Sequence, residues 1–536
     1  MHNFEITDSK TGMPVFKPLI TPKQRIIIHS LYDPQREADR VIGQYDFSGK
    51  EIIFLFGLGL GYHLKSLIAA AGGKPKIIVV ERFDKIFDFF KINKSRLNIN
   101  DANVDYLVNP DKSQIIFSAS KFITFRNFYK IKYITIPSLI KLDEQYYKSA
   151  ILDAYDFIKF TIANLSTASN FGYEWNVNYL KNLKRLSESY DIKSLKKFCK
   201  NKPAVIASAG PSLSRNLDLL KEFQDYFYIL CADTAYSALL KKNIYPDFIG
   251  AADSQYENFK LVKGLGSSKV GVICPPIVNH NILSEFDSSK KFFFASELPL
   301  DNYLKSKGIN LTFIKSGGSV ATILFSAARE IEFNPIIFIG QDLAFTGNIS
   351  HSALTSKIEH KYSSLSKFHS IENAFYAENS NQILCDDIFD NNVITSQSLL
   401  NFKNWFELEF TDKKSKYINS TGAGILKNNI EIVPFEEAIK LFCKNKINKT
   451  DLPEFSYFPK KIISSIIMSI KNELCELLKS EEEKILLKLT KSELNDMISS
   501  MIQFDLLNFE TGKLSQNELA KILKNIITKL LKDIDK

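Results

Sequence analysis

The most regular feature of this chain is a series of short, continuously apolar runs near its centre. Each run ends in small or polar residues, and the runs do not alternate apolar with polar positions. Strands that are covered on both faces of a parallel sheet have this pattern. We therefore predict buried strands at 204–209, 226–232, 247–252, 269–275, 291–295, 311–316 and 335–340.

The segments on either side of this series have different patterns. Towards the N-terminus, the apolar runs at 51–56 and 76–81 flank a glycine turn and a helical stretch. A helical connector with the aromatic-rich sequence FGYEWNVNYLKNLKRL runs from about Leu142 to about Lys200. The polar stretch at 347–395 is long for a loop in a compact domain, and such loops are more often functional than idle.

Beyond about Phe455, leucine and isoleucine recur at helical spacing between lysine and glutamate, which predicts a small helical bundle. The chain therefore reads as an α/β protein with three regions. We predict a Rossmann-like N-terminal domain at 1–165, a doubly wound central domain with the helical connector at 166–445, and an α-helical region at 446–536.

Composition narrows the class of protein. A chain of 536 residues with 45% apolar residues is too long for one core and apolar enough for several. No apolar stretch reaches 18 residues and no basic-then-apolar signal opens the chain, so we expect a cytoplasmic protein without a membrane span. The six cysteines form no CxxC pair, which favours reduced thiols over zinc or disulfides. The net charge of +9 comes mainly from lysine, and we interpret it as a solvated surface that does not bind nucleic acid.

The first glycine-rich junction is GLGLGYH, which lies between a predicted strand and a predicted helix. Gly57, Gly59 and Gly61 are followed, 20 residues after Gly61, by Glu81 at the end of the next strand. In a dinucleotide or S-adenosylmethionine site, such an acid binds ribose hydroxyls. The same glycines also suit a tight turn without a ligand, so this is a possible second cofactor site.

The second junction is SAGPSL, at the end of the predicted strand 204–209. Ser208, Gly210, Pro211 and Ser212 stand where a strand gives way to a helix. Proline suits the first turn of a helix, and the start of a helix offers N–H groups and a positive dipole end to an anion. An ordinary capped turn would have the same sequence.

Further polar clusters follow the other predicted strands. All of them fall at the carboxyl ends of parallel strands, the edge where open α/β sheets bind ligands. Because the carboxylates come singly rather than as a DxD motif, we expect a nucleoside monophosphate donor and no required metal. The clusters are Asp233-Thr234, Asp253, Ser316-Gly317-Gly318-Ser319 and Gly340-Gln341-Asp342.

With SAGPSL, with CADTAYSALLKKNIYPDFIGAADSQ at 231–255 and with GQDLAFTG at 340–347, the chain resembles the motility-accessory-factor family of bacteria. These proteins are implicated in attaching nonulosonic (sialic-acid-like) sugars to flagellin. The central region also resembles bacterial sialyltransferases that use CMP-activated sugars. The resemblance implies a metal-independent, inverting glycosyltransferase for flagellin glycosylation and motility, with a CMP-nonulosonic acid as donor and flagellin as acceptor.

By the same resemblance, the GPSL turn and the Ser316-Gly317 loop hold the CMP moiety, with Asp233 and Thr234 nearby. A histidine serves as the base, and His351, nine residues beyond Asp342, is our candidate; we include Asp342 and Asp253 in the catalytic set. His360 and His369 in the same loop are further candidates, and His280 is a weaker one. We expect the turns at 210–213 and 317–319 to hold the phosphate charge through backbone N–H groups.

Three alternatives stay open. The domain also resembles archaeal pterin pyrophosphokinases, in which ATP and Mg²⁺ would use Asp233, Asp253 and Asp342, although no lysine accompanies the glycine loop. The GLGLGYH turn with Glu81 permits methyl transfer. A flagellin-binding motility factor without catalysis is the third alternative.

Overall fold

We analysed a computed structural model of the protein. It describes residues 3–21, 24–25, 27–49, 51–72, 75–123, 127, 130–296, 298–349, 351–356, 382–449 and 457–535. The chain divides into two compact units: unit 1 comprises residues 1–170 with 502–519, and unit 2 comprises residues 171–501 with 520–536. The helices at 446–536, which the sequence sets apart as a third region, are divided between these two units.

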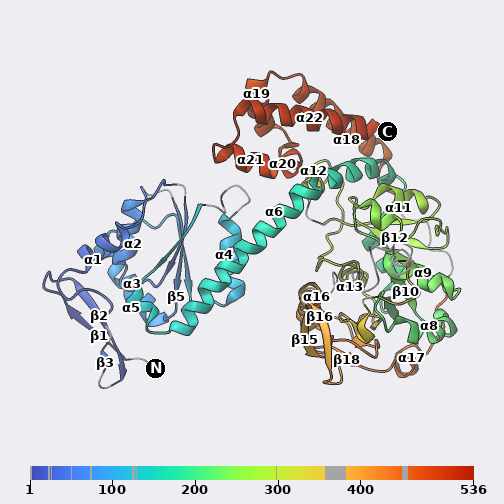
Figure 1. Ribbon diagram of the computed structural model, residues 1–536, viewed down its shortest axis with the longest axis horizontal. Coiled ribbons are helices and arrows are strands. Elements are labelled where there is room, and N and C mark those ends of the chain that lie inside the picture. Colours follow the sequence, from blue (N-terminus) through green and yellow to red (C-terminus); the bar gives the residue numbers. More distant parts are fainter. Residues whose placement is uncertain are drawn as a thin grey trace, which may run out of the picture. The chain divides into compact units, whose positions relative to one another are not determined.

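Unit 1 is built on a four-stranded parallel sheet with the order β6-β5-β4-β7 (Figure 1). All five residues of β4 are buried, and a separate apolar core lies on each face of the sheet, as the continuous apolar runs predict. A small antiparallel sheet of β1, β2 and β3 precedes it. The elements of unit 1 before the long connector are β1 (Asn3–Asp8), β2 (Pro14–Thr21), β3 (Gln24–Arg25), α1 (Pro34–Ile42), β4 (Ile52–Phe56), α2 (Tyr62–Ala70), β5 (Lys76–Glu81), α3 (Asp84–Leu97), β6 (Val104–Val108), α4 (Lys112–Phe122), β7 (Ile131–Thr135) and α5 (Pro137–Ile140).

The predicted connector is a single helix of 43 residues, α6 (Glu144–Leu186). Its first part belongs to unit 1 and its last part to unit 2. In unit 2, Gly172 lies so close to the backbone of Ser500 that a Cβ there would come within 2.6 Å of the carbonyl oxygen. The Tyr173 hydroxyl donates to Asp533 at 2.8 Å, and the Asn176 amide donates to the Ser500 hydroxyl at 3.1 Å. The aromatic-rich segment is therefore a helix-packing surface.

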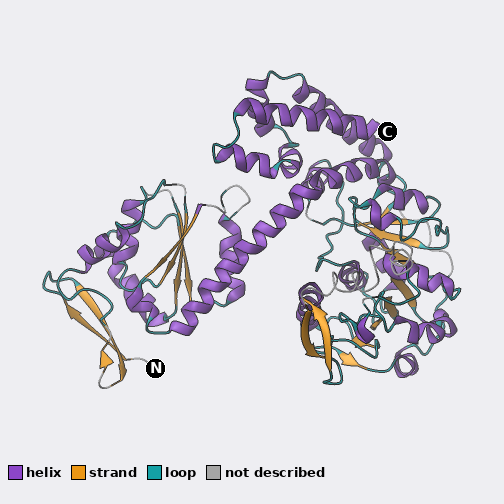
Figure 2. Ribbon diagram, viewed as in Figure 1, coloured by secondary structure: helices purple, strands orange, loops and turns teal. Residues whose placement is uncertain are grey.

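Unit 2 contains a nine-stranded, entirely parallel sheet with the order β18-β17-β14-β9-β10-β11-β12-β13-β8. Figure 2 colours its strands orange and the surrounding helices purple. Six of the seven central runs form strands, so the predicted parallel α/β fold is confirmed. The strands are β8 (Tyr190–Asp191), β9 (Ala204–Ala207), β10 (Tyr228–Ala232), β11 (Phe248–Gly250), β12 (Gly271–Cys274), β13 (Lys291–Phe293), β14 (Ile336–Ile339), β17 (Tyr417–Asn419) and β18 (Glu431–Ile432).

The strand predicted at 311–316 is wrong. Its only pairing among the described residues is an isolated bridge from Phe313 to Ala295, and the Phe313 side chain is 47% exposed. The Asp191 carboxylate takes the hydrogen-bonding groups of Thr312 instead, accepting from its N–H and its hydroxyl at 2.7 Å each. A side chain from a distant part of the sequence thus replaces the strand ladder.

Helices cover both faces of this sheet. The most deeply buried is α13, in which eight of eleven residues are buried and which packs on β9, β10 and β11. An antiparallel hairpin, β15 (Gln382–Asp386) with β16 (Asn392–Ser396), leads directly into α16. The helices of the sheet region are α7 (Lys196–Cys199), α8 (Leu213–Glu222), α9 (Asp233–Lys241), α10 (Tyr256–Phe259), α11 (His280–Glu285), α12 (Pro299–Ser306), α13 (Val320–Glu330), α16 (Gln397–Glu409) and α17 (Phe435–Phe442).

The C-terminal region is helical, as predicted. Its apolar stripes are buried, for example Ile466, Ile470 and Leu474 of α18. No helix in the described ranges is long and apolar enough to span a bilayer. The C-terminal helices are α18 (Lys460–Leu478), α19 (Glu482–Lys491), α20 (Asn495–Met501), α21 (Gln503–Glu510) and α22 (Gln516–Asp535).

Candidate functional site

The candidate site lies where the order of strands in the nine-stranded sheet reverses direction. From β9 the chain builds β10 to β13 on one side, and then returns to place β14 on the other side of β9. Such a reversal leaves a crevice outside the carboxyl ends of the two neighbouring strands. The turn after β9 contains Ser208 and Gly210, and the turn after β14 contains Gly340, Gln341 and Asp342.

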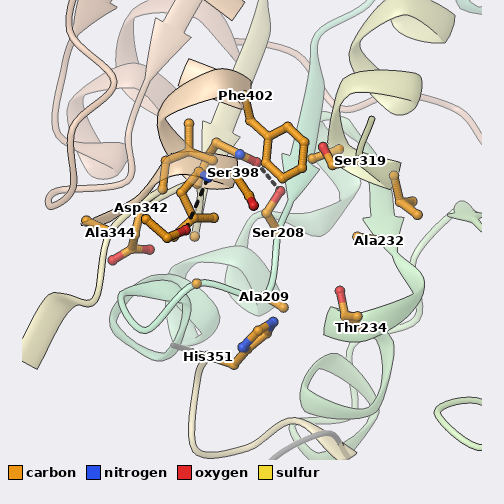
Figure 3. A pocket seen from close by; sticks show the side chains of 18 of the residues that line it. Ser208, Ala209, Ala232, Thr234, Ser319, Asp342, Ala344, His351, Ser398 and Phe402 are labelled. Atoms are coloured by element: carbon orange, nitrogen blue, oxygen red, sulfur yellow. Dashed lines mark hydrogen bonds between the residues drawn. The ribbon is translucent and has the colours of Figure 1, made fainter. Parts of the chain in front are cut away.

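A cavity of about 660 Å³ opens at this point (Figure 3). It is lined by eight of the predicted site residues, which come from the ends of β9, β10, β11 and β14, from the loop before α13 and from the segment after β14. Pro211, Ser212, Ser316 and Gly317 belong to the same turns but do not line it. The predicted residues that do are Ser208, Gly210, Asp233, Thr234, Asp253, Gly318, Asp342 and His351.

The turn at 208–213 is held closed by the protein itself. The Gly210 N–H donates to the Gly340 carbonyl at 2.8 Å, and the Leu213 N–H donates to the Gly210 carbonyl at 3.1 Å. The Ser212 N–H reaches Asp342 Oδ1 at 3.3 Å, and Pro211 has no N–H. Every backbone donor from Gly210 to Leu213 is therefore occupied, which corrects the expectation that residues 210–213 hold a phosphate through their backbone.

Asp342 faces the start of α8 rather than the cavity centre. Its carboxylate is 1% exposed and accepts the Ser212 hydroxyl at 2.7 Å. A Cβ at Gly210 would collide with this carboxylate, so glycine is required there for packing. Burial raises the pKa of Asp342, while the hydrogen bonds from Ser212 act in the opposite direction. Asp342 therefore occupies the anion position that the helix start offers.

The start of α13 is different, because its first donors stay open. Ser319 caps the helix by accepting the Thr322 N–H at 3.3 Å, and the Gly317 N–H donates to the Thr322 hydroxyl at 2.9 Å. The N–H groups of Val320 and Ala321, which line the cavity, have no acceptor among the described residues. They are the donors that the positive end of an eleven-residue helix leaves for a ligand.

The two glycines before α13 make room for aromatic rings. A Cβ at Gly317 would collide with the Trp405 ring, and a Cβ at Gly318 would lie 3.2 Å from Phe402 Cε1. Gly318 also has a φ of +93°, which other residues rarely adopt. The predicted phosphate role of Gly317 thus has a packing explanation, and the ligand donors lie one turn further on.

One wall of the cavity comes from α16, which sequence reasoning missed. Ser396 caps this helix by accepting the Leu399 N–H at 3.4 Å, and the N–H groups of Gln397 and Ser398 have no acceptor in the described part of the chain. Phe402, on the same helix, also lines the cavity (Figure 3). The capping serine is readable in the sequence, but nothing there says that α16 returns to the SGGS loop.

The electrostatics of the cavity are unusual for an anion site. None of the described residues that line it is lysine or arginine, whereas three aspartates, Asp233, Asp253 and Asp342, are part of the lining. Positive potential at this point comes from the N-terminal ends of α13 and α16. Gln341, 4% exposed, adds an amide whose Oε1 accepts the Ser208 hydroxyl at 2.5 Å, and its side-chain nitrogen has no acceptor among the described residues.

Of the candidate bases within the described residues, only His351 lines the cavity, where its imidazole lies near Ala209 and Thr234 (Figure 3). His280 does not line it; its Nδ1 lies 2.9 Å from Asn178 Oδ1, and burial lowers its pKa. His360 and His369 lie outside the described residues. Asp253 is exposed at the rim and accepts a hydrogen bond from the Asn258 amide.

A metal site would need several ligands at one point. In the described ranges, no three histidine, cysteine, aspartate or glutamate side chains come together in a way that could hold an ion. Asp233, Asp253 and Asp342 therefore do not form the joint site that the pyrophosphokinase reading assigns to them.

The glycine turn of unit 1 is filled by the protein, which corrects the prediction of a second cofactor site. Glu81 is fully buried and accepts the Leu58 N–H at 2.8 Å and the Phe83 N–H at 3.0 Å. Burial raises the pKa of Glu81, which these hydrogen bonds partly offset. Because the carboxylate closes the turn from inside, it is not available to ribose hydroxyls.

Neighbouring side chains pack closely against all three glycines of this turn. A Cβ on each of the three glycines of the turn would come within 2.6 to 2.8 Å of the protein, namely of Leu139 at Gly57, His29 at Gly59 and Phe90 at Gly61. All three glycines have positive φ values. The turn is thus a packed structural element, the interpretation that the sequence left open.

Comparisons with known proteins agree with this architecture. Residues 177–348 match the family model described as 6-hydroxymethylpterin diphosphokinase MptE-like. Two uncharacterized proteins of Treponema pallidum (strain Nichols) are similar: one is 30% identical over 102 residues, and the other 20% identical over 363 residues. The matches cover 19% and 64% of this chain and 48% and 61% of those relatives, so the chain spans about half to three fifths of their length.

Among solved structures, the MAf glycosyltransferase from Magnetospirillum magneticum AMB-1 has the same fold. It superposes with a TM-score of 0.57 and 12% sequence identity, over 99% of this chain and 90% of that chain. The predicted resemblance is thereby confirmed: the central residues match the pterin pyrophosphokinase-like family, and the whole chain shares the fold of a MAf glycosyltransferase.

Proposed function

We propose that this chain is a glycosyltransferase that moves a nonulosonic acid from a CMP-activated donor to a serine or threonine of flagellin. The observation that carries the proposal is the cavity at the reversal of strand order, whose lining includes Val320 and Ala321, with open N–H groups, and a candidate base, His351. The fold shared with a MAf glycosyltransferase supports it. Flagellin as acceptor follows from the resemblance of the sequence motifs.

The charges of the cavity favour a donor substrate with one phosphate group over a donor substrate with a diphosphate. A diphosphate needs a metal or basic side chains to offset its charge. Among the described residues, the cavity lining offers neither lysine nor arginine, and its carboxylates would repel a second phosphate group. A donor with one phosphate group, esterified on both sides, carries a single negative charge that the backbone N–H groups at the starts of α13 and α16 can bind.

The proposed chemistry is an inverting displacement without a metal. The acceptor hydroxyl attacks the anomeric carbon of the donor, its proton passes to the His351 imidazole, and the bond from the anomeric carbon to the phosphate oxygen breaks. The N–H groups of Val320 and Ala321 stabilise the charge that develops on the departing CMP. Asp342 positions the turn of α8 and does not touch the reacting atoms, because its carboxylate is bound to Ser212.

A second function is kept because residues 177–348 match a pyrophosphokinase-like family. The pyrophosphokinase reading assigns ATP and Mg²⁺ to Asp233, Asp253 and Asp342, which do not come together as a three-ligand site in the described residues. Asp342 is the least suited of these, because it is buried and already accepts the Ser212 hydroxyl. A non-catalytic flagellin-binding protein remains the third alternative, and it requires no ordered set of donors at the cavity.

The test is transfer itself. Purified protein is incubated in EDTA with flagellin and a CMP-activated nonulosonic acid, and the flagellin mass and the released CMP are measured. We expect one sugar mass added for each CMP released. His351→Asn should lower the rate by about 100-fold or more, because it removes the general base. His280→Asn is the matched control, since that histidine lies outside the cavity lining.

A parallel reaction without EDTA, supplied with Mg²⁺, ATP and a pterin as well as the CMP-activated sugar and flagellin, separates the alternatives. ATP-dependent pyrophosphoryl transfer to a pterin, with no sugar transfer, would replace the proposal with the kinase. Flagellin that binds but gains no mass, with or without Mg²⁺, would favour the non-catalytic factor.

A further inference from the structure

The wall that α16 contributes is fixed firmly to the sheet. The hairpin before it is tied to the loop after β14, because the Phe345 N–H donates to the Ile394 carbonyl and the Thr395 hydroxyl donates to the Leu343 carbonyl, each at 2.8 Å. On α16 itself, Glu407 accepts the backbone N–H groups of Lys427 at 3.2 Å and Asn428 at 3.0 Å. The side chains on this wall therefore have defined positions in the cavity.

The wall carries an aromatic ring beside the open donors of α13. Phe402 lies against Gly318, two residues before Val320, and both Phe402 and Val320 line the cavity. Trp405, one turn further along α16, packs on Gly317 and makes an edge contact with Phe325 at 6.2 Å between ring centroids. Phe402 is partly buried against the same core and also lines the cavity. Figure 3 shows its ring between Ser319 and Ser398.

A nucleotide has two chemically different ends, and this corner of the cavity has a surface for each. The phosphate is an anion that suits backbone N–H groups at the start of a helix. The base is a flat aromatic system, and stacking on a protein ring is its most general mode of recognition. Leu399 and Val320 extend the apolar surface around Phe402, while Gln341, with its open amide nitrogen, provides a polar contact in the same cavity.

We propose that Phe402 is a specificity-determining residue that stacks on the nucleobase of the donor, while the N–H groups of Val320 and Ala321 hold its phosphate. This inference rests on the proposed function and adds to it the part of the protein that recognises the nucleotide. The GG pair of the SGGS loop is needed because side chains at 317 and 318 would displace Trp405 and Phe402.

The test compares two ligands that differ by the base. CMP carries base, ribose and phosphate, and ribose 5-phosphate carries only the last two. Binding of each is measured by calorimetry in EDTA for the wild type, Phe402→Leu, Phe402→Tyr and Val320→Pro. Phe402→Leu keeps an apolar side chain against Gly318 and removes the aromatic face. Phe402→Tyr keeps the aromatic ring, so an effect seen in Phe402→Leu but not in Phe402→Tyr is due to the loss of stacking.

The expected pattern separates the two ends of the nucleotide. Phe402→Leu should weaken CMP about 10- to 100-fold and leave ribose 5-phosphate unchanged, because only the stacked base is affected. Val320→Pro should weaken both ligands, and Phe402→Tyr neither. CMP binding that persists in Phe402→Leu would overturn this inference and leave the proposed function intact. A wild type that binds neither ligand would overturn the proposed function, and this inference with it.

Discussion

The pairing of Ser212 with Asp342 gives a quantitative test of the site geometry. The Ser212 hydroxyl donates to the Asp342 carboxylate at 2.7 Å, and both side chains are about 1% exposed. A buried hydrogen bond to a charged group contributes about 1.5–3 kcal/mol. If the Asp342 carboxylate takes the place of a bound anion at the start of α8, this hydrogen bond stabilises the folded protein and does not contribute to ligand binding.

The perturbation is a double-mutant cycle with Ser212→Ala, Asp342→Ala and the double variant. We expect each single change to lower the unfolding free energy of unit 2. Asp342→Ala should lower it more than Ser212→Ala does, because it leaves two buried donors of Ser212 without an acceptor. The coupling between the two changes should be about 1.5–3 kcal/mol. Ser214→Ala is a matched control on α8, since that hydroxyl is exposed and bonds only the Pro211 carbonyl at 3.4 Å.

The assay is urea unfolding followed by tryptophan fluorescence. The chain has two tryptophans, Trp175 and Trp405, and both belong to unit 2, so the signal reports this unit alone. A coupling energy below about 0.5 kcal/mol would refute the reasoning, because independent sites are additive to within that value. Unchanged stability together with lost CMP binding would show that the Asp342 carboxylate acts on the ligand.

Three further outcomes follow from the structure. Gly317→Ala should lower the unfolding free energy of unit 2 by about 1–3 kcal/mol by overpacking Trp405, and a variant as stable as the wild type would contradict the close approach. His63 is buried with a pKa lowered to about 4 by desolvation, so below about pH 6.5 the unfolded chain binds a proton that the folded chain does not, and stability decreases as the pH falls. His63→Leu should remove about 2 kcal/mol of the loss between pH 7 and pH 5, seen as a flatter profile of urea midpoint against pH than that of the wild type when unfolding is followed by circular dichroism, because both tryptophans lie in unit 2. Glu81→Ala should destabilise unit 1, with a lower midpoint by circular dichroism, and calorimetry with S-adenosylmethionine should be silent for the wild type; measurable binding would restore the cofactor site.

The sequence predicted the fold and the location of the site because both depend on local patterns. Apolar runs mark strands that are buried on both faces, and polar residues after β9, β10, β11 and β14 mark the edge at which those strands end. That edge is a consequence of topology, so single-chain patterns are enough to bring Ser208, Asp233 and Asp253 together at one cavity.

The details that were missed depend on contacts between distant segments. The GLGLGYH turn has the spacing of a cofactor site. However, Leu139 and His29 pack against its glycines, and the Glu81 carboxylate accepts a backbone N–H of the turn. The SGGS glycines resemble a phosphate loop, yet they accommodate Trp405 and Phe402, more than 80 residues further along the chain. Glycine spacing shows where a backbone is approached closely, and only the fold shows by what.

The most direct test of the central claim is calorimetric titration with CMP in EDTA, using the wild type, Val320→Pro and Glu482→Pro. Val320 is the first residue of α13 and follows Ser319 in an extended conformation, so proline fits there and removes only one open N–H. Glu482 is the first residue of α19 and also follows an extended residue, outside the cavity lining, which makes it the matched control.

We predict that the wild type and Glu482→Pro bind CMP without a metal, and that Val320→Pro binds it about 10- to 100-fold more weakly, the equivalent of one charged hydrogen bond. If the wild type does not bind CMP in EDTA but binds ATP once Mg²⁺ is added, that result would contradict the account and establish the pyrophosphokinase reading in its place.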